Sequence, residues 1–125
     1  MKVTGCALAV AGLLSVGLAV AAPTPAKAEI DRAFGNTLVS QYPDGGWVRH
    51  WFNPDGTYAA RFSSGRTISA RWRVEGDRVC LNNISPAIMM ISRFCSPMIE
   101  AGVGESWTSR DPLGRRVTNV LQRGR

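Results

Sequence analysis

Hydrophobic and polar residues alternate along short stretches of the chain from residue 36 onward. In residues 66–74 every second position is apolar, and threonine, serine and arginine fill the positions between. Residues 57–62 continue the pattern, with Tyr58, Ala60 and Phe62 on one side. Because successive side chains of a β-strand point to opposite faces of the sheet, these stretches predict strands with one buried face.

Turn sequences separate these stretches at regular intervals. Residues 43–46 and 53–56 each combine a proline, which fixes φ, with an aspartate and a glycine, which favour tight turns. Shorter breaks fall at residues 63–65, 75–77 and 111–114. The sequence therefore predicts strands at residues 36–42, 47–52, 57–62, 66–74, 78–82, 105–110 and 115–123.

Two stretches leave alternatives open. Residues 47–52 carry aromatic side chains on both faces, so the apolar face cannot be chosen from the sequence. After a loop at 83–86, residues 87–91 form a continuous apolar run that fits either a strand buried on both faces or a short helix. We expect extended, buried structure there, because residues 91–95 could then pair antiparallel with residues 78–82.

Seven or eight short strands in sequential hairpins predict an all-β fold. The expected architecture is an antiparallel meander that curls into a small barrel, with a β-sandwich as the alternative. Closure into a barrel would remove the exposed strand edges that promote aggregation.

The N-terminal residues 1–28 have the organisation of a cleavable secretory signal. Lys2 precedes an apolar run, and Ala26 and Ala28 provide small residues before the expected cleavage site. Cleavage would leave one domain, residues 29–125, in the periplasm or outside the cell, with no membrane span. An exported domain of this size favours a disulfide, and Cys80 and Cys95 are its two cysteines.

Basic residues outnumber acidic ones in the exported part. Thirteen arginines against nine acidic residues leave a net charge near +4, because both lysines lie in the leader. Export argues against nucleic acid as the partner, whereas an anionic envelope ligand or an acidic protein would suit a positive field. A general preference for arginine over lysine explains the same composition, since acidic residues are interspersed.

Residues suited to catalysis or metal binding are sparse. His50 is the single histidine and sits within a predicted strand without a nucleophile motif, so a structural role is expected. Asp44, Asp55 and Asp111 occupy predicted turns, where aspartate bonds to the local backbone. The sequence offers no set of metal ligands, and we expect no cofactor and no enzymatic activity.

Two groups of residues are candidates for ligand binding. Trp47 and Trp51 could line the mouth of a barrel and stack on a flat or apolar ligand, although tryptophans also fill small cores. Arg61, Arg71 and Arg73 fall on the polar faces of neighbouring strands, where they could form a cationic patch or a plain solvated surface.

The segment 55–81 resembles a pattern found in small exported proteins of Gram-negative bacteria. Its elements are Asp55-Gly56-Thr57-Tyr58, then Arg71-Trp72-Arg73-Val74, then Gly76-Asp77 ahead of Cys80. Those proteins are uncharacterised lipocalin-like or calycin-like β-barrels. The resemblance implies a small barrel and transfers no functional residue.

Taken together, these features indicate a non-enzymatic periplasmic binding or interaction module. Its ligand would be a small apolar or anionic envelope molecule. The alternatives are an inhibitor or assembly factor for another envelope protein, and a hydrolase whose site is assembled from scattered residues.

Overall fold

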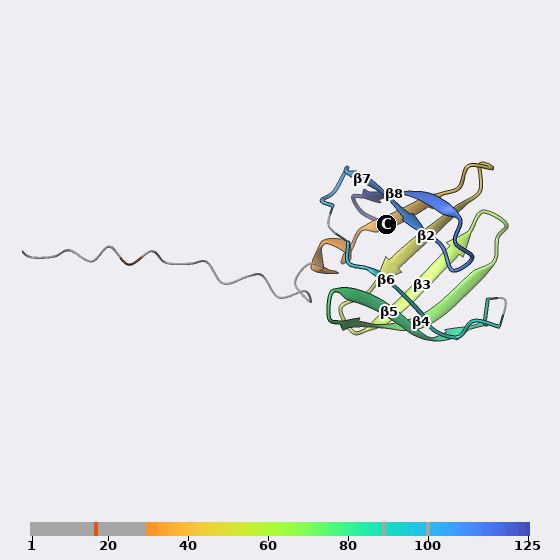
Figure 1. The fold of residues 1–125 in the computed structure, drawn as a ribbon, viewed down its shortest axis with the longest axis horizontal. Coiled ribbons are helices and arrows are strands. Elements are labelled where there is room, and N and C mark those ends of the chain that lie inside the picture. The colour runs from red at the N-terminus through yellow and green to blue at the C-terminus, as the bar shows by residue number, and fades with distance from the viewer. Residues whose placement is uncertain (1–16, 18–29, 89, 100) are drawn as a thin grey trace, which may run out of the picture.

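Eight antiparallel strands form one curled sheet in the computed structural model, which describes Gly17 and residues 30–88, 90–99 and 101–125 (Figure 1). In chain order the strands are β1 (Thr37–Gln41), β2 (Trp47–Phe52), β3 (Thr57–Phe62), β4 (Thr67–Glu75), β5 (Arg78–Ser85), β6 (Phe94–Pro97), β7 (Ser106–Arg110) and β8 (Arg116–Gln122). One 3-10 helix, η1 (Ile30–Ala33), precedes them. The all-β prediction is confirmed, and within the described ranges no helix is long and apolar enough to cross a membrane.

The strands follow the order β6-β5-β4-β3-β2-β1-β8-β7. Strands β1 to β6 are therefore a meander, and the β7–β8 hairpin continues the sheet on the other side of β1. β6 and β7 are the two edges and do not pair with each other. The meander curls into a half-barrel, as the sequence led us to expect in part. Hydrogen bonds between β6 and β7, which would close the sheet into a full barrel, are not formed.

The buried faces of β3 and β4 match the alternation in the sequence. Tyr58 and Ala60 on β3 and Ile68 and Trp72 on β4 are all buried, while the residues between them are more exposed. Directly paired residues share a face, and His50 on β2 lies between Leu38 and Ala60. The concave face of β2 is therefore the one with Val48, His50 and Phe52.

A hydrophobic end closes one side of the half-barrel. Ile30 and Ala33 of η1 are buried, and Leu121 near the end of β8 has no exposed surface. Phe34 follows η1 and packs against the ring of Trp72 at 5.7 Å between centroids.

The aspartates of the turns bond to the local backbone, as expected from the sequence. The Oδ1 atom of Asp44 accepts from the Gly46 amide at 2.9 Å, and Oδ1 of Asp55 accepts from the Thr57 amide at 3.0 Å. Gly56 between Asp55 and β3 has a φ of 88°, a conformation that glycine adopts without strain. Strand ends are thus set by turn chemistry.

The segment between β5 and β6 differs from expectation. β5 continues through Ser85, so the expected loop at 83–86 is wrong for its first three positions. Between β5 and β6, Ile88 and Ile91 form an isolated β-bridge. Met90 is 96% exposed, so the expected burial of this stretch is wrong for that residue.

The disulfide prediction is confirmed. Cys80 on β5 lies directly opposite Cys95 on β6, and their sulfurs are bonded. The bond fastens the short edge strand β6 to its neighbour β5. The predicted leader, residues 1–28, lies outside the described residues apart from Gly17.

Candidate functional site

The concave face of the half-barrel holds a cavity of about 750 Å³. All eight strands contribute to its wall, and most of the lining is apolar, as with Leu38, Phe52, Ile68, Leu81 and Phe94. Binding sites for small molecules are concave, mostly apolar and of roughly 300–1,000 Å³. The cavity is therefore of the size and character that holds a small ligand.

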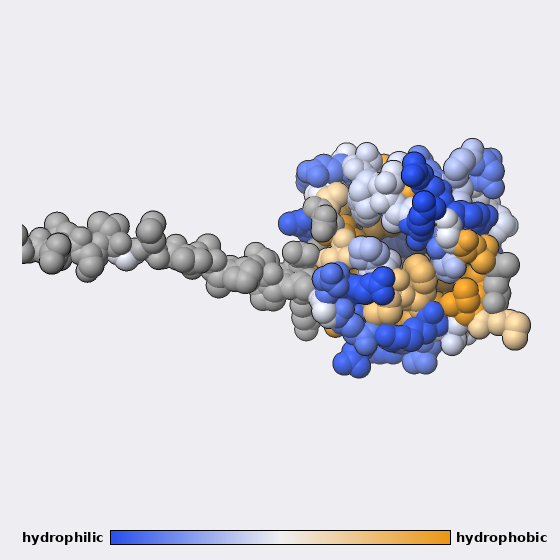
Figure 2. Space-filling model, viewed as in Figure 1, coloured by the Kyte–Doolittle hydropathy of each residue, from blue (hydrophilic) through white to orange (hydrophobic). Residues whose placement is uncertain are grey.

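The two edge strands both border the cavity. Ser96 and Pro97 of β6 lie on one side, and Ser109 and Arg110 of β7 lie on the other. Because β6 and β7 are not hydrogen-bonded to each other, the wall is interrupted between them. Figure 2 shows hydrophobic surface on the face over which β6 passes, with hydrophilic side chains around it.

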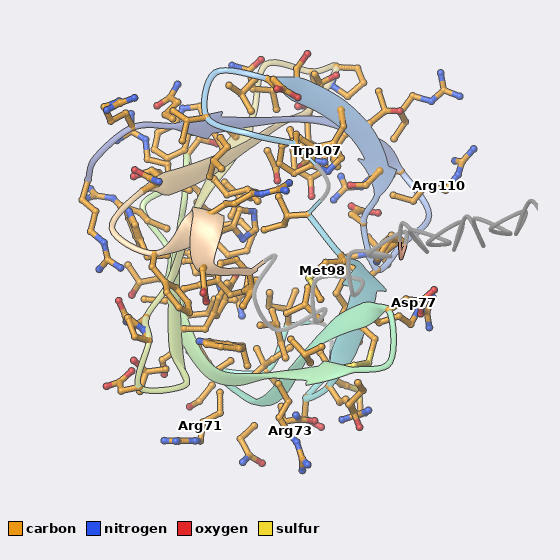
Figure 3. The ribbon with its side chains drawn as sticks, turned by 90° about the vertical axis from the view of Figure 1, so that its left-hand side faces the viewer. Arg71, Arg73, Asp77, Met98, Trp107 and Arg110 are labelled. Atoms are coloured by element: carbon orange, nitrogen blue, oxygen red, sulfur yellow. A yellow bond between two sulfur atoms is a disulfide. The ribbon has the colours of Figure 1, made fainter. Side chains whose placement is uncertain are left out.

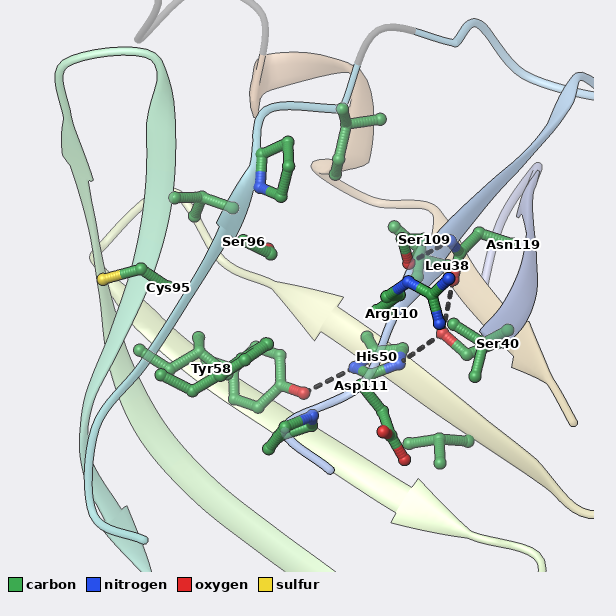
Figure 4. A pocket seen from close by; sticks show the side chains of 18 of the residues that line it. Leu38, Ser40, His50, Tyr58, Cys95, Ser96, Ser109, Arg110, Asp111 and Asn119 are labelled. Carbon is green, nitrogen blue, oxygen red and sulfur yellow. Dashed lines mark hydrogen bonds between the residues drawn. The ribbon is translucent and has the colours of Figure 1, made fainter. Parts of the chain in front are cut away.

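A chain of hydrogen bonds crosses the cavity wall from β3 to β7 (Figure 4). His50 Nδ1 lies 2.5 Å from the Tyr58 hydroxyl, and His50 Nε2 lies 2.9 Å from Ser40 Oγ. The Ser40 hydroxyl donates to Asn119 Oδ1 at 2.7 Å, and Asn119 Nδ2 donates to Ser109 Oγ at 2.8 Å. We call Tyr58, His50, Ser40, Asn119 and Ser109 the polar relay.

The direction of each bond in the polar relay follows from the number of protons available. Ser40 has one hydroxyl proton, and the carbonyl oxygen of Asn119 can only accept it. His50 Nε2 must therefore carry a proton and donate to Ser40 Oγ. A neutral imidazole has one N–H, so His50 Nδ1 is bare and accepts from Tyr58.

Burial keeps both titratable members of the relay uncharged. It lowers the pKa of His50 from 6.5 to about 4, because removal from water disfavours the charged imidazolium. Burial also raises the pKa of Tyr58, with a smaller contribution from Tyr42. Near neutral pH the relay is a set of neutral, hydrogen-bonded groups.

The Ser40–His50 pair resembles a hydroxyl–imidazole dyad, but its polarity is the reverse of a catalytic one. A general base would accept the serine proton, whereas here the imidazole donates to serine. Both ring nitrogens of His50 are occupied by partners within the fold. The arrangement suits positioning and recognition better than proton abstraction.

A second polar group lies at the turn between β7 and β8, beside the cavity. Asp111 accepts from the Arg115 guanidinium at 2.8 Å, and that guanidinium lies 4.9 Å from the centre of the Tyr42 ring. Burial acts to raise the pKa of Asp111, but hydrogen bonds from the Arg115 backbone and side chain outweigh it and lower the pKa. Asp111 is thus an anion neutralised by its neighbour.

The tryptophans proposed as ligand contacts lie on the outer face of the sheet. Trp47 is covered by Arg49, whose guanidinium carbon is 4.5 Å from the ring centroid. The Trp51 indole N–H donates to Thr37 Oγ1 at 3.0 Å. Neither side chain lines the cavity. That they bind a ligand on the outer face stays a prediction.

The arginines proposed as a patch also lie outside the cavity. Arg61 on β3 is exposed directly opposite Arg49 on β2. Arg71 and Arg73 point outward from β4 (Figure 3), and Arg71 lies farther along the sheet, opposite Thr57. The structure places all three on the convex face without joining them into one cluster.

The remaining tryptophans face inward. Trp72 is buried in the core, as expected from its place in the alternating run, and its indole N–H donates to the Asn53 carbonyl at 2.8 Å. Trp107 on β7 borders the cavity. The sequence did not distinguish Trp107 from the outer tryptophans, because β7 is short and its neighbours are not evident from the chain.

One group of potential metal ligands occurs among the described residues. It joins Glu75 to Cys80 and Cys95. The two sulfurs are bonded to each other, so neither is a thiolate, which is the form that binds metal. The group is accounted for by the disulfide.

The sequence did not indicate three members of the polar relay as site residues: Ser40, Asn119 and Ser109. Serine and asparagine within a strand carry no motif, and their meeting depends on strand pairing. One signal was available, because Asn119 sits two residues from both Val117 and Leu121, on the apolar side of its strand. A polar residue at such an inward position needs a buried partner.

Comparisons with known proteins identify no relative: no family model, curated protein or solved structure matches this chain.

Proposed function

We propose that this protein is a non-enzymatic binding module that holds a small apolar ligand in its interior cavity. The observation that carries the proposal is the 750 Å³ cavity on the concave face, with its largely apolar wall. A fold that only needed a stable core would gain by filling this space, because unfilled apolar volume costs stability.

The polar relay supports binding over catalysis. Its groups satisfy one another across five strands, and its Ser40–His50 pair has the wrong polarity for a nucleophile. A hydrolase would also need an activated nucleophile facing the substrate. Among the described residues, those that border the cavity include no free cysteine and no acid besides the paired Asp111.

The proposal includes export, with the leader at residues 1–28 and action in the periplasm or outside the cell. The Cys80–Cys95 disulfide supports this location, because such bonds persist in oxidising compartments. A curled antiparallel sheet around an apolar cavity is also the arrangement of lipocalin-like proteins, which supports the resemblance of residues 55–81.

Titration calorimetry with small aliphatic and aromatic compounds tests the proposal. We expect saturable binding with a negative heat-capacity change, because apolar surface is buried. The blocking variant is Ser96→Trp, since Ser96 on β6 points into the cavity beside Val79 (Figure 4). This substitution should weaken binding by about tenfold or more.

The matched control is Ser69→Trp, which adds the same side chain on the exposed outer face of β4. It should leave binding unchanged. Absence of binding across the panel, or equal loss in both variants, would refute the cavity as the binding site.

A further inference from the structure

The polar relay ends in a hydroxyl whose proton has no acceptor among the described residues. Ser109 Oγ accepts from Asn119 Nδ2 at 2.8 Å, and it makes no second hydrogen bond within that part of the chain. Ser109 is half-buried and borders the cavity. Its hydroxyl is therefore a hydrogen-bond donor available to a molecule inside the cavity.

The relay runs in one direction, from Tyr58 on β3 to Ser109 on the edge strand β7. Each member donates to the next and accepts from the one before. Hydrogen bonds arranged in series polarise one another, which strengthens the donor at the end of the chain. The wall thus presents at Ser109 a hydroxyl whose proton can be donated to a molecule in the cavity.

Charge near this end of the cavity favours an anion. Among the described residues, Arg110, Arg115 and Asp111 border the cavity at the β7–β8 turn, whereas Arg78 borders it at the start of β5, at the opposite end of the strands. Asp111 is matched by Arg115, which leaves the positive charge of Arg110 in excess at the Ser109 end. Arg110 follows Ser109 directly and lies at the interrupted wall between β6 and β7 (Figure 3).

We infer that the ligand is an apolar molecule with a single acceptor head group, a carboxylate above all, which Ser109 binds at the β7 edge of the cavity. The apolar part would lie against Leu38, Phe52 and Phe94 in the interior. This inference rests on the proposed binding function and adds the chemical class of the ligand. An alkylammonium head group has no acceptor for the Ser109 proton and would be repelled by the positive charge of Arg110.

A series of probes with one tail and different heads tests the inference: decanoate, methyl decanoate and decylammonium. Decanoate should bind about tenfold or more tighter than decylammonium, which has no acceptor for the Ser109 hydroxyl. Methyl decanoate should fall between them, since it accepts the hydrogen bond without the charge. This ordering separates the contribution of the hydrogen bond from that of the arginines.

Three variants locate the donor. Ser109→Ala should weaken the binding of decanoate and methyl decanoate by about fivefold each and change that of decylammonium by less than about twofold. Ser109→Thr keeps the hydroxyl and should keep the affinity for both acceptor head groups. Tyr58→Phe removes the hydroxyl at the other end of the relay and should also keep that affinity, because Ser109 remains the donor.

The possible failures are distinguishable. If no probe of the series binds, the proposed binding function fails as well. If all three bind equally well to the unmodified protein, binding stands and the acceptor head group is refuted. If decanoate binding weakens in Tyr58→Phe but not in Ser109→Ala, the donor is not Ser109 and the assignment is overturned.

Discussion

His50 owes its environment to residues far apart in the chain. Ser40 and Tyr58 hold its two ring nitrogens, and Asn119 fixes the direction of the Ser40 hydroxyl. No buried side-chain nitrogen or oxygen lacks a partner in the described part of the chain. A polar network inside an apolar wall stabilises a fold only when its members satisfy one another. The relay meets that condition from Tyr58 to Asn119 while His50 stays neutral.

Stability should therefore fall as His50 becomes protonated. The unfolded chain takes up a proton near pH 6.5, while the folded protein resists protonation down to about 4. The free energy of unfolding should be highest above pH 6.5 and drop by about 3 kcal/mol as the pH falls to 4. Denaturant unfolding at a series of pH values measures this slope.

The control is His50→Gln, which keeps an amide donor and acceptor but does not titrate. In that variant the free energy of unfolding should be flat between pH 6.5 and 4. Asp55 and Asp111, whose pKa values are lowered, would still destabilise both proteins at lower pH. An equal slope in the two proteins would show that His50 is not the group responsible.

At the scale of elements, the edge strand β6 depends on the disulfide. β6 has four residues and pairs with β5 alone, and Cys80 and Cys95 occupy directly opposite positions. Residues on such a short edge strand have few contacts to hold them in place. Since β6 forms one border of the cavity, its attachment also shapes the binding site.

Replacing both cysteines by serine should lower the free energy of unfolding by about 3 kcal/mol, given the 15-residue separation. Amide hydrogen exchange should show lost protection in β6 and retained protection in β1, β2 and β3. The unmodified protein under reducing conditions should behave in the same way. Uniform loss of protection across the sheet would contradict the local role of the bond.

The strands could be predicted because their limits are set locally. Proline, aspartate and glycine define the turns at 43–46 and 53–56, and these turns set the ends of β2. The concave face of β2 could not be predicted, because its two sets of residues are similarly apolar. Pairing of His50 with Leu38 and Ala60 decides that face, and pairing is not a local property.

For the whole molecule, the cavity follows from incomplete closure of the sheet. β6 and β7 both border the interior without pairing, so side chains from opposite edges face each other across an unfilled space. The sequence directed attention to Trp47 and Trp51, but a hollow interior depends on the curvature of the whole sheet. Alternation in single strands carries no information about that curvature.

The central claim is that this interior is an open apolar cavity able to accept a ligand. A crystal structure determined under xenon pressure tests it most directly, because xenon enters apolar cavities and is visible in electron density. We expect xenon in the space enclosed by Leu38, Phe52, Ile68 and Phe94. Crystals in which β6 packs against β7 and the interior holds no xenon would contradict it.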